Sequence, residues 1–237
     1  MKERSQARVA RGGSPLALCP LRFLCVLCGI LLPSVGRADE FSQLSRYSAQ
    51  MFPRGTVLVD TRVGDLTVEG WDQGRVEIEA EKVVRAKSEA SASRLYEQIK
   101  IELKENEEEL RLRAIFPSRR PWRLFRGATR LSVNFRIRMP AEASLFVTCV
   151  DGDLRIRGIA GRQEVHVNYG NVEISIPSLW RIRSLRARTW LGYAQSDLHG
   201  EDSAGFGRKI SFSNPQGEQD ISVQVRFGGV YIYRNAE

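Results

Sequence analysis

The sequence VHVNYGNVEI at residues 165–174 recurs as VQVRFGGVYI at residues 223–232, with no insertion or deletion between the copies. Each copy alternates apolar and polar residues, reaches a glycine, and then alternates again. Strict alternation is typical of a β-strand with one buried face, and a glycine between two such runs indicates a turn. The repeated unit is therefore a strand, a corner and a second strand.

The second half of this unit occurs four times, each time as a glycine, then Asp, Asn or Gly, and then an alternating apolar run. A corner glycine can adopt positive φ, and an Asp or Asn beside it can hydrogen-bond to the backbone of its own turn. We therefore predict structural turn positions rather than calcium ligands. These positions are Gly64, Asp65, Gly152, Asp153, Gly170, Asn171, Gly228 and Gly229.

The spacing of the corner glycines predicts how the units follow one another. Gly152 and Gly170 are 18 residues apart, Gly170 and Gly192 are 22 apart, and Gly192 and Gly228 are 36 apart, which is two steps of 18. Repeats of this length are typical of solenoids, in which each strand–turn–strand rung buries its apolar row against the next rung. The sequence predicts an all-β, single-domain β-solenoid. If its last rung, residues 230–233, is uncapped, copies could associate through the solenoid ends.

One segment departs from the two-residue period. Ala92, Leu95 and Ile99 lie three or four residues apart, and no glycine or proline interrupts them. This period predicts a short helix inserted near residues 88–100, with Ser88 as its N-cap, lying across one end or edge of the sheet.

A hairpin is expected directly after this helix. Its strands at 101–104 and 110–114 flank an acidic turn at 105–109. Because no His or Cys accompanies the carboxylates of this turn, we interpret it as a solvated loop rather than a metal site.

The first 38 residues have the composition of a secretory signal peptide. Basic residues precede an uninterrupted apolar run at 23–32, and a small-residue segment then ends at Ala38. A membrane-spanning helix needs about 20 apolar residues, so this run is short for one. We predict cleavage after Ala38, with an uncleaved anchor or a lipoprotein signal at Cys28 as the alternatives. The protein is then exported, to the periplasm or to the extracellular cell surface.

A signal at 1–38 leaves a short polar lead at 39–54 and one domain at 55–237, because no linker divides the remainder. Six basic residues and one acid lie in the signal, so the formal net charge falls from +8 for the whole chain to +3. Three of the four cysteines also lie there. Cys149 alone remains, which excludes an internal disulfide, and its place in an alternating strand predicts a buried, inert thiol.

The histidines give little support for catalysis. His166 lies at an outward strand position, and His199 lies in a turn close to Ser196 and Asp197. A catalytic triad needs a base that the fold places against an activated hydroxyl, which neighbours in one turn rarely provide. Two histidines without a paired cysteine also argue against zinc. We predict no catalytic residue, no metal and no cofactor.

An arginine-rich segment at 116–127 is the strongest candidate for a binding site, because it breaks the strand pattern and combines four arginines with three aromatic residues. The candidate surface-binding residues are Arg119, Arg120, Trp122, Arg123, Phe125 and Arg126. A second basic group contains Arg181, Arg183, Arg186 and Arg188, beside Trp180 and Trp190. Each basic residue near an anionic bilayer contributes about 1 kcal/mol. Outside the cytoplasm the fitting partners are anionic lipid, lipopolysaccharide or envelope polysaccharide, and not nucleic acid; the alternative is a merely solvated surface.

Three segments resemble the bacterial putative-adhesin family of envelope domains. They are 133–140, a strand that ends in Met-Pro; 145–156, which ends in Gly-Asp-Leu-x-Ile; and 165–174, which ends in Gly-Asn-Val-x-Ile. The resemblance extends over about residues 55–233. It implies a single-domain right-handed β-solenoid in an exported or membrane-tethered protein, and it assigns no catalytic residue.

The leading interpretation is a non-enzymatic, adhesin-like binding or scaffolding module. The alternative is a carbohydrate-active β-helix enzyme similar to a polysaccharide lyase. Such an enzyme needs an Asp or Glu aligned with an Arg or Lys in successive rungs of a groove. The repeat positions Asp153, Asn171 and Gly229 form no such row.

Overall fold

The computed structural model describes residues 39–106, 108–117, 131–197 and 203–234. In these residues the protein is all-β with one α-helix, α1 (Glu89–Gln98), and a short 3₁₀ turn, η2 (Leu179–Arg181). The strands are β1 (Asp39–Gln50), β2 (Thr56–Val63), β3 (Leu66–Trp71), β4 (Arg75–Ala86), β5 (Lys100–Glu105), β6 (Glu109–Ile115), β7 (Leu131–Pro140), β8 (Ser144–Asp151), β9 (Leu154–Arg157), β10 (Gln163–Tyr169), β11 (Val172–Ile176), β12 (Ile182–Ser196), β13 (Ser203–Ser213), β14 (Gln219–Phe227) and β15 (Val230–Arg234). They form one continuous sheet of 15 strands.

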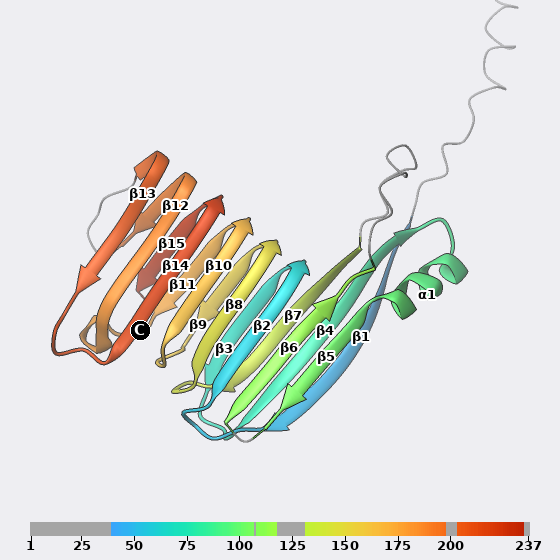
Figure 1. The fold of residues 1–237 in the computed structure, drawn as a ribbon, viewed down its shortest axis with the longest axis horizontal. Helices are drawn as coiled ribbons and strands as arrows, with labels where there is room; N and C mark the ends of the chain where they lie inside the picture. Colours follow the sequence, from blue (N-terminus) through green and yellow to red (C-terminus); the bar gives the residue numbers. More distant parts are fainter. Residues whose placement is uncertain (1–38, 107, 118–130, 198–202, 235–237) are drawn as a thin grey trace, which may run out of the picture. The chain divides into compact units, whose positions relative to one another are not determined.

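Two ladders of parallel strands form the centre of this sheet. The first contains β2, β8, β10 and β14 in that order, and the second contains β3, β9, β11 and β15. Strand β12 joins both ladders, because its first part pairs with β14 and its residues Ala194–Ser196 pair with β15. Figure 1 shows the strands side by side, with β12 and β13 at one end of the row and β1 and α1 at the other.

The core lies between the two ladders. The two copies of the repeated sequence are direct neighbours there, since Val165 pairs with Val223 and Val172 pairs with Val230. Buried apolar side chains continue in rows through successive strands. One such row contains Phe135, Leu66, Leu154, Val172, Val230 and Ala194. Full burial of a Val or Leu side chain contributes about 1.5–3 kcal/mol, so these rows hold the ladders together.

The order of the units in space differs from their order in the chain. The N–H of Gly170 donates to the carbonyl of Phe227, and the N–H of Gly228 donates to the carbonyl of Leu191. Neighbouring steps of 18 residues therefore hold from Gly152 to Gly170 and are wrong beyond it. The reason is that β12 and β13 form an outer hairpin, after which β14 and β15 return and insert between β10–β11 and β12.

The expectation that residues 230–233 form the last rung is also wrong. Strand β15 lies between β11 and β12, and β12 is the last strand of the parallel ladders. Strand β13 pairs antiparallel with β12 from Ser184/Ser213 to Ala194/Ser203 and covers that edge.

At the other end, residues 39–50 form strand β1 rather than part of a polar lead. β1 pairs antiparallel with β4 from Asp39/Ala86 to Gln50/Arg75. Its composition hides this pairing, because an edge strand is held mainly by backbone hydrogen bonds and needs few buried residues. Ala49 is buried, Phe41 and Tyr47 pack against the core, and most other side chains of β1 are exposed.

The predicted helix and the hairpin after it are confirmed. The Ser88 side chain accepts the N–H of Ser91 at the start of α1, and Ala92 is its buried residue. The Lys82 ammonium of β4 donates to the carbonyl of Tyr96, which fixes the helix against the edge of the sheet. Strands β5 and β6 pair antiparallel around the acidic turn. Within the described ranges, α1 is too short and too polar to span a membrane.

Candidate functional site

A ladder of side-chain hydrogen bonds runs along the glycine corners. Asp65 Oδ1 accepts the N–H of Asp153 at 3.0 Å, and Asp153 Oδ1 accepts the N–H of Asn171 at 2.8 Å. Asn171 Oδ1 in turn accepts the N–H of Gly229 at 2.9 Å. Each side chain therefore bonds to the next unit in space, where the sequence analysis expected a bond to its own turn. The corner residues connect the units as well as turning the chain.

The corner glycines are required by close backbone contact. Gly170 has φ of +133°, and a Cβ at this position would collide with the carbonyl oxygen of Gly152. A Cβ at Gly228 would collide in the same way with the carbonyl oxygen of Gly170. Glycine supplies both the backbone conformation and the space, so the corners stack in a fixed geometry.

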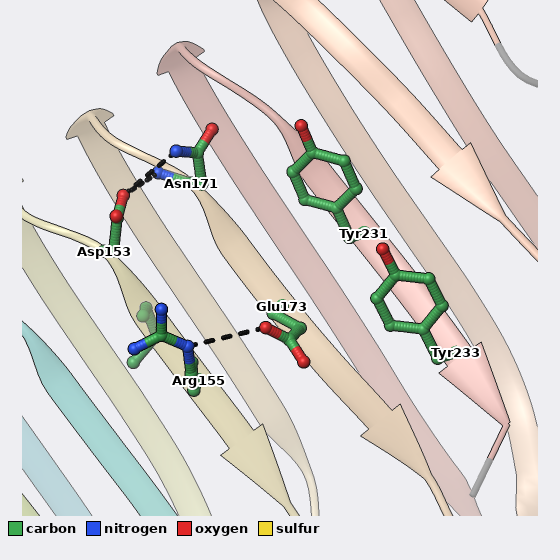
Figure 2. A pocket seen from close by; sticks show the side chains of 7 residues that line it. Asp153, Arg155, Asn171, Glu173, Tyr231 and Tyr233 are labelled. Atoms are coloured by element: carbon green, nitrogen blue, oxygen red, sulfur yellow. Dashed lines mark hydrogen bonds and ion pairs between the residues drawn. The ribbon is translucent and has the colours of Figure 1, made fainter. Parts of the chain in front are cut away.

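A pocket of about 230 Å³ lies beside this ladder, on the outward face of β9, β11 and β15 (Figure 2). Its lining residues are Asp153, Leu154, Arg155, Asn171, Glu173, Tyr231 and Tyr233. Arg155 Nε lies 3.5 Å from a carboxylate oxygen of Glu173, and Arg157 reaches the other oxygen at 3.7 Å. The charged residues in the lining are two acids and one arginine, so the pocket has a small negative excess.

Two tyrosines of β15 form one side of this pocket. The ring centroids of Tyr231 and Tyr233 are 6.4 Å apart and their planes differ by 12°. Figure 2 shows the rings side by side along the strand, with both hydroxyls toward its start. A Cβ on Gly229 would lie 2.8 Å from both Cζ and the hydroxyl oxygen of Tyr231. Gly229, which stands where other corners carry Asp or Asn, thus makes room for the Tyr231 ring.

A second pocket, of about 500 Å³, lies on the outward face of β6, β2, β8 and β10. Its lining residues are Leu58, Val59, Asp60, Arg111, Arg113, Phe146, Val147, Thr148, Glu164 and His166. Asp60 pairs with Arg113 at 3.2 Å, and Glu164 contacts His166 Nε2 at 3.2 Å. The hydrogen bond from His166, with a further one from Arg162, holds the pKa of the Glu164 carboxyl below its usual value.

Both pockets contain an acid aligned with an arginine of a neighbouring strand, which was the criterion for a carbohydrate-active enzyme. Asp60 is in register with Arg113, and Glu173 is in register with Arg155. The sequence analysis missed these pairs because it compared the corners, whereas the pairs occupy outward strand positions. Each carboxylate is partly exposed and already bound by arginine, which is a common surface feature worth about 0–1 kcal/mol. The alignment by itself therefore does not favour an enzyme.

A basic and aromatic surface lies on the outward side of β14, β12 and β13. Its members, which we call the basic end surface, are Arg186, Arg188, Trp190, Lys209 and Arg226. Arg188 stands opposite Gln224 on one side and Lys209 on the other, which places these side chains on one face. In the part of the chain that the structure describes, none of the four cations forms an ion pair with a carboxylate.

Exposed aromatic rings accompany these cations. Trp190 is 53% exposed and packs edge-on against Phe227 and Phe206, with ring centroids 5.2 and 5.9 Å away. Phe206 is itself 72% exposed. Phe227 also stacks on Tyr169 of β10, so the aromatic cluster extends over four strands.

The predicted arginine loop lies outside the described residues. Arg119, Arg120, Trp122, Arg123, Phe125 and Arg126 therefore remain a sequence prediction. The second predicted group is divided by the structure: Arg186 and Arg188 lie on the basic end surface with Trp190, while Arg183 pairs with Asp220. The hydrogen bond from Arg183 lowers the pKa of the Asp220 carboxyl, and the same pairing raises the pKa of Arg183.

No family model matches the chain, and no curated protein matches it. A putative cell adhesion protein from Clostridium sporogenes matches with a TM-score of 0.48 and 9% identity, over 81% of this chain and 100% of its own. A putative adhesin from Bacteroides fragilis gives 0.25 and 9%, over 81% and 97%. A putative lipid binding protein from Parabacteroides distasonis gives 0.23 and 8%, over 82% and 97%. The chain is similar to these bacterial proteins in fold alone.

The remaining candidates for chemistry are separated or buried. Cys149 is free and buried, and desolvation raises the pKa of its thiol to about 11, as expected for an inert cysteine. Ser196 is buried and Asp197 is exposed, while His199 lies outside the described residues. Among the residues that the structure describes, no three His, Cys, Asp or Glu side chains are grouped as metal ligands.

Proposed function

We propose that this protein is a non-enzymatic, adhesin-like binding or scaffolding module of the cell envelope, and that it engages anionic surfaces through basic and aromatic side chains. The observation that carries this proposal is the basic end surface. Four cations without carboxylate partners among the described residues lie beside an exposed tryptophan on one sheet face. Charge-free aromatic rings and basic groups together suit the interfacial region of an anionic bilayer.

The scaffold of this module is, in our proposal, a right-handed β-solenoid with two flat faces. The parallel register through β8, β10 and β14, and again through β9, β11 and β15, supports it. The stacked corners at Gly152, Gly170 and Gly228 support it further. Such a scaffold would present its side chains in straight rows, which suits contact with an extended surface. Export to the periplasm or cell surface rests on the predicted signal at 1–38.

Co-sedimentation with lipid vesicles tests this function. Residues 39–237, which lie in one compact unit, are mixed with neutral phosphatidylcholine vesicles or with vesicles containing anionic phosphatidylglycerol, across a salt series. Binding is expected only to the anionic vesicles and is expected to weaken as salt rises. With about 1 kcal/mol for each basic residue, changing Arg186, Arg188, Lys209 and Arg226 to Gln predicts a loss of up to about a thousandfold.

The matched control removes the same number of arginines from another part of the sheet. Arg46, Arg136, Arg138 and Arg155 are each paired with a carboxylate, and their change to Gln is expected to leave binding almost unaltered. A third variant changes Arg119, Arg120, Arg123 and Arg126 to Gln and measures the share of the predicted loop. Absence of binding to anionic vesicles, or equal losses in the end-surface and control variants, would contradict the proposal.

A further inference from the structure

We infer that the pocket beside Tyr231 and Tyr233 binds one neutral sugar ring of a glycan. This site lies on the outward face of β9, β11 and β15, whereas the basic end surface lies on β12, β13 and β14. It differs from the proposed anion-binding surface in its residues, its charge and its ligand. The two proposals therefore stand or fall separately.

The tyrosine pair supplies an aromatic platform. The two rings are half-buried and nearly parallel, with centroids 6.4 Å apart along β15. A pyranose has one face made largely of C–H groups, which carry partial positive charge. The face of an aromatic ring is electron-rich, so C–H groups pack favourably against it.

Polar groups converge on the same pocket from two other strands. The Asp153 carboxylate uses Oδ1 for the corner ladder, and its Oδ2 has no hydrogen-bond partner among the described residues. Glu173 is oriented by Arg155 at 3.5 Å, and both side chains line the pocket (Figure 2). Carboxylates accept hydrogen bonds and guanidinium groups donate them, often in pairs, which matches the adjacent hydroxyls of a sugar.

The charge of the lining selects against anionic ligands. Asp153 and Glu173 outnumber Arg155, and Arg155 is already paired with Glu173. A phosphate or a uronate would meet an unpaired carboxylate at this site, which disfavours its binding. Nucleotides also stack on aromatic rings, but their phosphates face the same repulsion. A neutral sugar gains the stacking and the hydrogen bonds without this penalty.

The site is preformed. The Tyr231 ring occupies the space that a side chain at residue 229 would fill, and Asn171 is held by bonds to both Asp153 and Gly229. Groups that are already ordered lose little conformational freedom on binding. A volume of about 230 Å³ is below the usual range of roughly 300–1,000 Å³ for small-molecule pockets, so one ring rather than a long chain is expected to enter.

Saturation-transfer NMR of the purified chain with neutral trisaccharides tests this inference. The probes are maltotriose, mannotriose, cellotriose and triacetylchitotriose, with trigalacturonate as the anionic comparison. At least one neutral probe is expected to bind with a Kd on the order of 1 mM, and more tightly than trigalacturonate. Tyr231→Ala and Tyr233→Ala are each expected to weaken this binding at least tenfold. Tyr231→Phe keeps the ring and is expected to retain it.

Gly229→Asn provides the sharpest variant. It restores the corner side chain found at Asn171 and takes the space of the Tyr231 ring, and the φ of Gly229 is not in the positive region. Sugar binding is expected to be lost while the unfolding midpoint is retained. Tyr193→Ala removes a tyrosine that is 62% exposed elsewhere and is expected to change nothing.

Three results would overturn the inference: no transfer to any neutral probe, tighter binding of trigalacturonate, or equal binding by wild type and Tyr231→Ala. Vesicle binding is measured on the same variants and is expected to be unchanged. A loss of sugar binding with intact vesicle binding separates this site from the basic end surface.

Discussion

The side-chain oxygen of Asn171 accepts the backbone N–H of Gly229 at 2.9 Å, across 58 residues of sequence. This bond joins the two copies of the repeated stretch at their corners. Gly229 is buried, so water does not replace the bond if it is lost. Asn171 therefore satisfies a donor that would otherwise be left unpaired inside the protein.

Asn171→Ala is expected to lower the free energy of unfolding by roughly 1–3 kcal/mol, the usual penalty for an unsatisfied buried donor. The matched control is Asp65→Ala, which removes the equivalent acceptor from the exposed N–H of Asp153. Water can replace that bond, so a loss below about 1 kcal/mol is expected. Urea unfolding of the three proteins measures both values. Equal losses would show that burial of the Gly229 amide does not matter.

Gly170→Ala is expected to destabilise the protein by roughly 2–6 kcal/mol. The new Cβ combines an unfavourable φ of +133° with a collision against the Gly152 carbonyl. Gly207→Ala is the control, because Gly207 also has positive φ, +65°, but a Cβ there meets nothing within 4 Å. It should cost only about 1–2 kcal/mol. Thermal or urea unfolding compares the two, and similar losses would mean that the close corner contact is unimportant.

The sequence predicts the local elements well because alternation reports which side chains face a core. It identified the strands on both sides of Gly152, Gly170 and Gly228, and the helix that begins after Ser88. It could not predict which strands are neighbours. The outer hairpin of β12 and β13 leaves the spacing of 36 residues equal to two repeats, so the detour is invisible to periodicity.

The candidate site shows the same division. Asp153, Asn171 and Gly229 were recognised as corner residues, but only the parallel register brings them beside Tyr231. A signal was available in the repeat itself. The residue two positions after the Asp, Asn or Gly is always outward, and in successive units it is Thr67, Arg155, Glu173 and Tyr231. Reading that column predicts a polar row that ends in an aromatic residue.

The Cys149 thiol is expected to be unreactive in the folded protein. Its side chain is buried, and desolvation raises the pKa of the thiol to about 11, so thiolate is scarce at pH 8. Ellman's reagent should therefore modify no thiol in residues 39–237 under native conditions and one thiol in urea. The modification rate across a urea series should follow global unfolding. Rapid labelling without urea would show that the core around β8 opens locally.

Acid is expected to weaken the protein partly through Glu164 and Asp220. Hydrogen bonds from His166 to Glu164 and from Arg183 to Asp220 lower the pKa of each carboxyl in the folded state. A carboxyl with a lowered folded pKa binds protons more readily when unfolded. Its stabilisation is therefore complete above the unfolded value, about 4, and is lost as pH falls through the folded value.

Glu164→Gln and Asp220→Asn should each lower the free energy of unfolding near pH 7 by up to about 1 kcal/mol, because both pairs are partly exposed. The difference from wild type should shrink as pH falls below the unfolded value, where the wild-type carboxyls are protonated as well. Urea unfolding at a series of pH values measures it. Glu142→Gln is the control, since its carboxylate is 53% exposed and lies 3.6 Å from Arg54. A difference from wild type that stays constant down to the lowest pH would mean that these variants act through packing, because a neutralised carboxylate can no longer favour its arginine or histidine partner.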